Sequence, residues 1–312
     1  MELLGEKLIS IVVPVYNEEE VVSQFYFRLS SVLRKIQYNY EIIFIDDGSS
    51  DKTLSILEEL AAEDKNLRVI NFSRNFGHMI ALSAGLDYAS GDAVITMDSD
   101  LQHPPELISE LLEKWKEGNE VVNTIRIEAK KTSLFKKISA KFFYFLMNRI
   151  ARTSFQANSA DYRLLDKSVV ESIKRMNEHS RFLRGLINWV GYKQESVSYQ
   201  ADERLAGKTK YSCWRMLSFA LDGITSFSSF PLRLSTYLGL IIAFFSFIYI
   251  LHAIYTKLIG EAIAGWASVL ITVLFIGGVQ LIFLGVIGEY LARVYEETKN
   301  RPLYIIRKKI GF

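Results

Sequence analysis

The chain has 312 residues, of which 49% are hydrophobic and 23% charged, and its formal net charge is +2. This length accommodates about two domains, and the nearly balanced charge does not favour a nucleic acid as partner. The single cysteine, Cys213, excludes an internal disulfide and agrees with a reducing compartment.

The first part of the chain alternates strand-like and helix-like segments. Apolar, often β-branched runs typical of buried parallel strands occur at Ile9–Val13, Glu41–Ile45, Leu67–Phe72, Ala93–Met97 and Val121–Thr124. Helices are predicted over 18–36, 51–64 and 78–89, and Pro104-Pro105 open a fourth. The alternation predicts an α/β fold with a doubly wound parallel sheet and right-handed crossovers.

Polar residues follow four of these strands directly. They are Tyr16-Asn17-Glu18, Asp46-Asp47, Ser73-Arg74-Asn75 and Asp98-Ser99-Asp100. Ligands of such sheets bind beyond the carboxyl ends of the strands. The four groups are therefore predicted to share one rim, and their common location points to a ligand site.

The strongest local motif is Asp98-Ser99-Asp100-Leu101-Gln102. Two carboxylates spaced in this way at a strand end can converge on one divalent cation, and hard oxygen ligands suit Mg²⁺ or Mn²⁺ together with phosphate oxygens. The alternative is a surface turn with two solvated acids. The position at the rim, beside Asp46 and Asp47, favours the metal.

A second motif, Pro14-Val15-Tyr16-Asn17-Glu18, can contact a base and ribose through backbone amides, Asn17 and a stacked Tyr16. Asp46-Asp47-Gly48-Ser49-Ser50 could serve the same pocket, although both motifs are also compatible with ordinary capped turns. Neither a P-loop nor a dinucleotide-binding glycine fingerprint occurs.

The last third of the chain is predicted to meet a membrane. Residues 234–256 and 262–288 lack Asp, Glu, Lys and Arg, and each run exceeds the roughly 20 residues that span a bilayer as a helix. Two buried core helices are the alternative. Basic residues lie before the first run and after the second, so the positive-inside rule predicts that both chain ends are cytoplasmic.

Two further helices are predicted near the membrane. Residues 133–152 combine apolar residues at helical spacing with Lys136, Lys137, Lys141 and Arg149. This pattern favours an interfacial helix on anionic lipid over an amphipathic helix packed on the sheet. Residues 211–231 are predicted to form a juxtamembrane helix that leads into the bilayer.

The motifs PVYNE, DDGSSD and DSDLQHPP resemble those of the family 2 glycosyltransferases of the GT-A fold. Asp161-Tyr162-Arg163-Leu164, Arg181-Phe182-Leu183-Arg184-Gly185 and Glu203-Arg204 with Gly207-Lys208 and Lys210-Tyr211 narrow the resemblance. It becomes one to polyisoprenyl-phosphate glycosyltransferases, nearest to the bactoprenol glucosyltransferases and then the dolichyl-phosphate mannose synthases. The Gln-x-x-Arg-Trp motif of processive polysaccharide synthases is absent from the sequence.

The resemblance implies a GT-A fold with a mixed, mainly parallel sheet, and it implies roles for individual residues. Catalytic roles fall to Asp161, which faces the acceptor, and Asp100. The metal would be held by Asp98, Asp100 and Gln102. The donor would be bound by Pro14, Tyr16, Asn17, Glu18, Asp46, Asp47, Asp98 and Ser99. Lipid phosphate or diphosphate would be bound by Arg126, Lys137, Arg204 and Lys210, although juxtamembrane orientation charge is the alternative for Arg204 and Lys210.

These inferences predict an enzyme that transfers a sugar, glucose from UDP-glucose, to undecaprenyl phosphate at the cytoplasmic face of the inner membrane. The transfer is expected to invert the configuration of the anomeric carbon. The expected organisation is a catalytic domain over 1–210, a juxtamembrane helix, a two-helix membrane segment over 232–292 and a cytoplasmic tail over 293–312. Mannose or an aminosugar as the transferred sugar, a non-catalytic membrane scaffold and self-association remain open.

Overall fold

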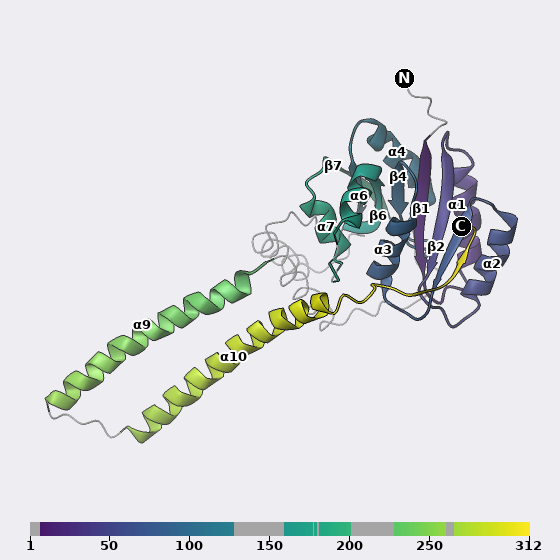
Figure 1. The fold of residues 1–312 in the computed structure, drawn as a ribbon. Helices are drawn as coiled ribbons and strands as arrows, with labels where there is room; N and C mark the ends of the chain where they lie inside the picture. Colours follow the sequence, from purple (N-terminus) through teal and green to yellow (C-terminus); the bar gives the residue numbers. More distant parts are fainter. Residues whose placement is uncertain (1–6, 128–158, 177, 180, 201–227, 260–264) are drawn as a thin grey trace. The chain divides into compact units, whose positions relative to one another are not determined.

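The computed structural model describes residues 7–127, 159–176, 178–179, 181–200, 228–259 and 265–312 (Figure 1). The predicted interfacial helix over 133–152, most of the predicted juxtamembrane helix, and Lys137, Arg204 and Lys210 lie outside these residues. The chain divides into two compact units. One contains the α/β region together with residues 301–312, and the other contains residues 218–300.

The α/β unit is built on an eight-stranded sheet in the order β7-β5-β6-β4-β1-β2-β3-β8. The strands are β1 (Leu8–Val15), β2 (Asn39–Asp46), β3 (Leu67–Phe72), β4 (Ala93–Thr96), β5 (Val121–Ile127), β6 (Ser159–Asp166), β7 (Gln194–Gln200) and β8 (Ile306–Ile310). Only β6 and β8 run against the other strands of this sheet. The sheet is therefore mixed and mainly parallel, as the resemblance implied.

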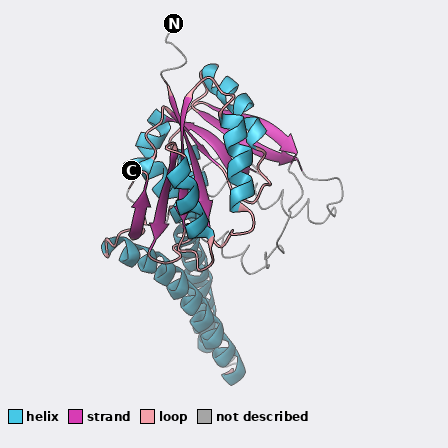
Figure 2. Ribbon diagram, turned by 90° about the vertical axis from the view of Figure 1, so that its right-hand side faces the viewer, coloured by secondary structure: helices cyan, strands magenta, loops and turns pink. Residues whose placement is uncertain are grey.

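Helices cover both faces of the sheet, and Figure 2 shows them on either side of the strands. The α/β unit contains α1 (Val22–Leu33), α2 (Thr53–Glu63), α3 (His78–Tyr88), the short η2 (Pro105–Leu107), α4 (Ile108–Lys116), α6 (Lys167–Lys174) and α7 (Leu183–Trp189). Helices α1, α2 and α4 pack on one face, and α3, α6 and α7 pack on the other.

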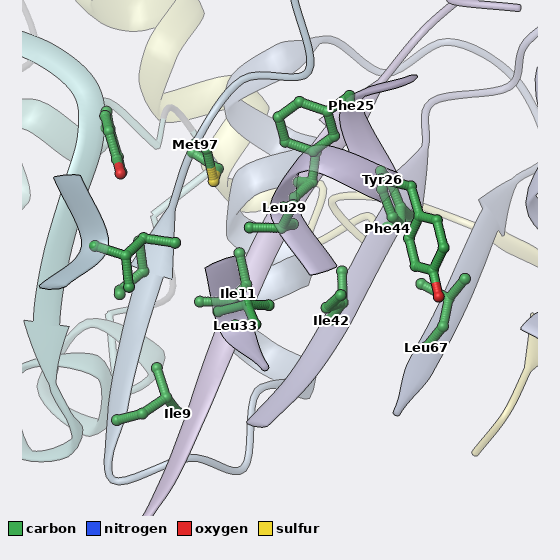
Figure 3. Close-up of a cluster of buried hydrophobic side chains, with 14 of the residues drawn as sticks. Ile9, Ile11, Phe25, Tyr26, Leu29, Leu33, Ile42, Phe44, Leu67 and Met97 are labelled. Atoms are coloured by element: carbon green, nitrogen blue, oxygen red, sulfur yellow. The ribbon is translucent and has the colours of Figure 1, made fainter. Parts of the chain in front are cut away.

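Alternation along the central strands explains this two-sided packing. Successive side chains of a strand point to opposite faces, so Ile11 and Val13 of β1 face the α1 side whereas Val12 faces α3. Figure 3 shows the α1-side cluster, to which Ile11 belongs and in which the Phe25 and Phe44 rings lie 6.2 Å apart between centroids. The near-continuous apolar runs that predicted buried strands are thus divided between two cores.

The C-terminal residues complete the sheet, which sequence analysis did not anticipate. Strand β8 pairs antiparallel with β3, and the amide of Ser73 donates to the carbonyl of Ile305 at 2.9 Å. The Tyr304 ring stacks on Phe72 at 5.1 Å between centroids. Part of the predicted cytoplasmic tail is therefore an edge strand of the α/β unit.

The second unit contains two long apolar helices, α9 (Phe230–Leu258) and α10 (Trp266–Thr298). The segments Phe230–Thr256 and Ile271–Thr298 have mean hydropathies of 2.2 and 2.3. In each helix, no part of the most apolar stretch is buried. The buried core helices considered as the alternative would be shielded by protein. Exposed apolar surface of this length indicates membrane association.

Candidate active site

Two loops at the carboxyl ends of β1 and β2 interlock. Asn17 has a left-handed backbone (φ 55°), and its side-chain oxygen accepts a 2.9 Å hydrogen bond from the amide of Ser50. In return, the amide of Asn17 donates to Ser49 Oγ at 2.9 Å. Tyr16, next to this contact, leaves 47% of its surface exposed. The interlocked loops thus hold an exposed aromatic side chain of the kind that can stack on a base.

Asp46 and Asp47, at the end of β2, are buried and act on the surrounding loops. Asp46 accepts from the Ser49 amide at 3.0 Å and from Asn71 Nδ2 at 2.7 Å. Asp47 accepts from the amides of Phe76 and Gly77 at 2.6 and 2.9 Å. Burial raises the pKa of Asp47 despite these backbone hydrogen bonds. The two carboxylates therefore fix the loops that follow β2 and β3.

Gly48 is required where these loops meet. Its φ is +69°, and a Cβ built on it would lie 2.5 Å from the backbone carbon of Arg74. Any other residue would need both a strained left-handed backbone and a displaced neighbouring loop. The glycine in the DDGSS motif thus permits the close approach that forms this side of the rim.

The acidic motif follows β4 and turns back on itself. Leu101 has a positive φ of 61°, and the amide of Gln102 donates to Asp100 Oδ1 at 3.1 Å. Arg126 of β5 donates from Nη1 to the side-chain oxygen of Gln102 at 3.1 Å. The structure therefore joins Arg126, which was predicted to bind phosphate with Lys137, Arg204 and Lys210, to the acidic motif.

The motif fits a divalent cation that shares its ligands with a phosphate. Within the described residues, no group of three or more His, Cys, Asp or Glu side chains is arranged to hold a metal alone. Asp98 Oδ1 is, however, a buried oxygen that accepts no hydrogen bond from the described residues, although His78 Nε2 lies 3.5 Å from it. Mg²⁺ is commonly bound by one or two carboxylates and substrate phosphates. Asp98 and Asp100 suit a site of this kind, in which substrate phosphates supply further ligands.

Strand register brings Asp161 to the same place. In the antiparallel pair of β4 and β6, Thr96 lies opposite Arg163, so the start of β6 lies beside the end of β4. Thr96 also donates from Oγ1 to the carbonyl of Asp161 at 2.6 Å. Asp98 follows Thr96 by two residues, and Asp161 precedes Arg163 by two. Two carboxylates 63 residues apart in the sequence therefore meet at one rim.

Asp161 is surrounded by nitrogen donors. Arg184 of α7 binds it as a fork, with Nε and Nη2 each 2.8 Å from one carboxylate oxygen. Arg163 adds a contact of 3.2 Å. His78, the first residue of α3, places Nε2 at 3.6 Å from Asp161 and 3.5 Å from Asp98. His78 thus lies between the two acids.

These contacts decide the protonation of the cluster. Burial alone would raise the pKa of Asp161, but hydrogen bonds from Arg184 and His78 and the nearby guanidinium charges hold that pKa well below its usual range. Burial opposes protonation of His78, yet Asp161 and Asp98 outweigh it and raise the histidine pKa. Asp161 is therefore a stably ionised carboxylate.

His103 supports the acidic motif from behind. Its Nδ1 accepts a 2.9 Å hydrogen bond from the amide of Asp98, and its ring stacks on Tyr162 at 5.2 Å between centroids. An Nδ1 that accepts this hydrogen bond carries no proton. Its 3.7 Å contact with the Asp98 carboxylate is consequently not an ion pair. His103 positions the backbone of the motif.

The structure brings most of the predicted site residues to the described rim. The segments from Pro14 to Glu18, from Asp46 to Asp47 and from Asp98 to Gln102 lie there with Asp161 and Arg126. Ser99 is buried at this rim, with 4% of its surface exposed. From the sequence, His78 was interpreted as a positioning or surface residue, and neither Arg163 nor Arg184 had a predicted role. The Arg181–Gly185 segment was noticed only for its resemblance, and nothing in its spacing pointed to Asp161.

A mixed α/β sheet with an acidic D-x-D segment at its rim confirms the GT-A fold class expected from the sequence. Residues 10–174 match the model of glycosyl transferase family 2, and residues 230–294 match the GtrB C-terminal hairpin. The chain belongs to glycosyl transferase family 2, and it is a glycosyltransferase.

Several relatives are similar over nearly the full chain. An uncharacterized glycosyltransferase of Synechocystis, sll0501, is 48% identical over 96% of this chain and 94% of its own length. A prophage bactoprenol glucosyl transferase homolog of Escherichia coli is 46% identical over 96% of this chain and 98% of its own. The bactoprenol glucosyl transferase of Shigella phage SfII is 46% identical over 96% and 97%, respectively.

Proposed function

We propose that the enzyme transfers glucose from UDP-glucose to a polyisoprenyl phosphate, with undecaprenyl phosphate as the acceptor. The observation that carries this proposal is similarity to bactoprenol glucosyl transferases over both the catalytic domain and the C-terminal hairpin. The exposed apolar helices agree with it, because a lipid acceptor is available only at a membrane. The enzyme would thereby be held where its acceptor lies.

The catalytic unit and both chain ends are proposed to lie on the cytoplasmic side. Strand β8 follows the second apolar helix and pairs with β3 of the N-terminal region. Residues before and after the two helices therefore belong to one sheet, which supports an even number of membrane crossings. Basic residues that flank the apolar segments favour the cytoplasm as the side of that sheet.

The donor is proposed to bind along the rim from β1 to β4. Tyr16 would stack on the base, and the loops fixed by Asn17, Asp46 and Asp47 would shape the nucleotide pocket, with Pro14, Glu18 and Ser99 beside it. Asp98, Asp100 and Gln102 would bind Mg²⁺ or Mn²⁺ together with the donor diphosphate. The cation, when bound, neutralises charge on the leaving diphosphate.

The reaction is proposed to be a single in-line displacement with inversion. An acceptor phosphate oxygen forms a bond to the anomeric carbon as the bond from that carbon to the nucleoside diphosphate breaks. The attacking oxygen is already anionic near neutral pH, so no strong base is needed. A stably ionised Asp161 suits an orienting role better than proton transfer. Arg126, Lys137, Arg204 and Lys210 would bind phosphate groups.

A panel of nucleotide sugars tests this proposal. The full-length protein in lipid nanodiscs is incubated with undecaprenyl phosphate, Mg²⁺ or Mn²⁺ and each radiolabelled donor, and labelled lipid is extracted. UDP-glucose is expected to give the fastest transfer. Preference for a mannose or aminosugar donor would revise the sugar, and no lipid product from any donor would support a non-catalytic scaffold.

A further inference from the structure

The Asp161–Arg184 pair joins a buried group to an accessible one. The side chain of Asp161 is 10% exposed, whereas the guanidinium-bearing side chain of Arg184 is 34% exposed. Both oxygens of Asp161 are engaged by the fork from Arg184 at 2.8 Å. A substrate that approaches this part of the rim therefore meets the guanidinium of Arg184 before the carboxylate behind it.

Local charge makes this position attractive to an anion. Arg163, whose side chain is 5% exposed, also contacts Asp161 at 3.2 Å. Two guanidinium groups thus share one carboxylate, and the three side chains carry a net positive charge. Arginine presents planar donors that match phosphate oxygens. Arg184 is the more accessible of the two arginines, so it is the one that can offer this charge to a ligand.

The position also suits the acceptor rather than the base or ribose of the donor. His78 connects Asp161 to Asp98, at 3.6 and 3.5 Å, respectively. The loop of Tyr16 and Asn17, which is proposed to bind the nucleoside, contacts the segment after β2. In the sheet, β2 is separated from β6 by β1 and β4. Without a cation nearby, the carboxylates beside Asp98 would repel an acceptor phosphate that attacks there.

We propose that Arg184 binds the phosphate group of the acceptor and that Asp161 is the positioning residue that holds its guanidinium in place. The inference rests on the proposed function and deepens it by assigning an acceptor ligand that the sequence motifs did not reveal. Arg163 supplies the buried second charge that keeps the pair net positive. Asp161 then acts on the acceptor through Arg184 and does not receive a proton.

Two other roles for Arg184 predict different kinetics. As a structural clamp between α7 and β6, it would affect folding and lower kcat without selectivity between substrates. As a ligand of the donor diphosphate, it would affect the KM for UDP-glucose. An acceptor ligand affects the KM for the lipid phosphate instead. The three roles are therefore separable by measuring both KM values with the full-length protein in nanodiscs.

The test compares Arg184→Gln and Arg184→Lys with Arg28→Gln. Arg28 is a matched control, because it forms a fork with Glu106 through Nε and Nη2 at 3.0 and 2.9 Å and is 33% exposed. Arg184→Gln is expected to raise the KM for undecaprenyl phosphate on the order of 10- to 100-fold, the scale of a hydrogen bond to a charged group. The KM for UDP-glucose should change less than about twofold, and Arg28→Gln should change neither.

Two further arms identify the phosphate and the role of Asp161. A short-chain prenyl phosphate should show the same relative loss in Arg184→Gln, because the contact is to the headgroup. Asp161→Asn should raise the acceptor KM in the same direction, and the double variant should be no worse than Arg184→Gln alone, since the residues act as one unit. If Arg184→Gln does not fold, Arg184→Lys, which keeps the charge but loses the fork, should show a smaller acceptor-selective loss.

The proposal is overturned if the Arg184 variants raise the donor KM, lower kcat with an unchanged acceptor KM, or show additive loss with Asp161→Asn. Each of these results is obtained against a wild-type protein that makes lipid-linked sugar. A wild-type protein that makes none would contradict the proposed function itself. The two failures are thus distinguished within one set of assays.

Discussion

The rim of the sheet has two halves that stabilise their carboxylates by different means. After β2, Asp46 and Asp47 are held by backbone amides and by Asn71. After β4 and at the start of β6, Asp161 is held by two arginines and faces a histidine. The first half, which we call the fixed half, uses the Asp46 and Asp47 carboxylates to fix loops. The second, which we call the charged half, gathers Arg163, Arg184 and His78 around the Asp161 carboxylate. A pocket whose loops are fixed by hydrogen bonds suits a nucleoside, and a cluster of charged side chains suits phosphate chemistry.

The largest expected effect is predicted for the acidic motif after β4. Asp100→Ala removes a proposed metal ligand and should lower kcat on the order of 10²–10³-fold, the scale seen when an electrostatic stabiliser of a transition state is lost. Steady-state transfer at saturating Mg²⁺ or Mn²⁺ measures it, with Glu63→Ala on the exposed surface of α2 as control. Near-normal turnover of Asp100→Ala would remove this residue from the metal site.

A second change addresses the fixed half alone. Asp47→Ala leaves the amides of Phe76 and Gly77 without their carboxylate acceptor. Loss of a partner by buried donors costs about 1–3 kcal/mol, so the free energy of unfolding should fall by that amount. The KM for UDP-glucose should rise more than that for the lipid phosphate. Denaturant unfolding and both KM values check the prediction, and an acceptor-selective defect would contradict the division into halves.

The smallest effect is predicted away from both halves. Asp166 caps α6 by accepting from the amide of Ser168 at 2.9 Å, and Trp115 Nε1 donates to it at 2.8 Å. Asp166→Ala should lower the free energy of unfolding by about 1 kcal/mol, a typical cost of a lost N-cap. Both KM values should stay unchanged, so this variant shows what destabilisation alone does to the kinetics.

The same variant has a predicted pH dependence. Burial would raise the pKa of Asp166, but hydrogen bonds from Ser168 and Trp115 outweigh it and lower that pKa. A lowered carboxyl pKa stabilises the fold above the unfolded-state value of about 4, and this contribution is lost as the pH falls through the folded-state pKa. The stability difference between wild type and Asp166→Ala should therefore be constant near neutral pH and narrow in acid. A difference that widens in acid would contradict this.

The fixed half could be predicted from sequence because its signals are local. Apolar runs such as Ile9–Val13 predicted β1, and the polar residues directly after them predicted the rim. Pro105 is at the start of η2, as predicted, because the first turn of a helix tolerates proline. The predicted helix from Glu18 begins only at Val22, because the backbone amides of residues 17–19 donate instead to side chains between β2 and the start of α2.

The charged half could not be predicted in the same way, since its contacts depend on register and tertiary packing. Nothing local links Asp161 to Arg184, and the antiparallel direction of β6 is not encoded in its own residues. Strand β8 was missed for a related reason. Arg307, Lys308 and Lys309 resemble juxtamembrane charge, but charged side chains are also typical of edge strands. Lys308 instead contacts Glu58 at 2.8 Å.

The central claim is that the two halves together join a sugar to a lipid phosphate. The most direct measurement is the structure of the product that the full-length enzyme makes from UDP-glucose and undecaprenyl phosphate, determined by mass spectrometry and by NMR of the anomeric centre. The expected product is a glucosyl undecaprenyl phosphate with the inverted, β configuration at the anomeric carbon, and it should form only when the lipid phosphate is present. Free glucose as the sole product, or a lipid product with retained α configuration, would contradict it.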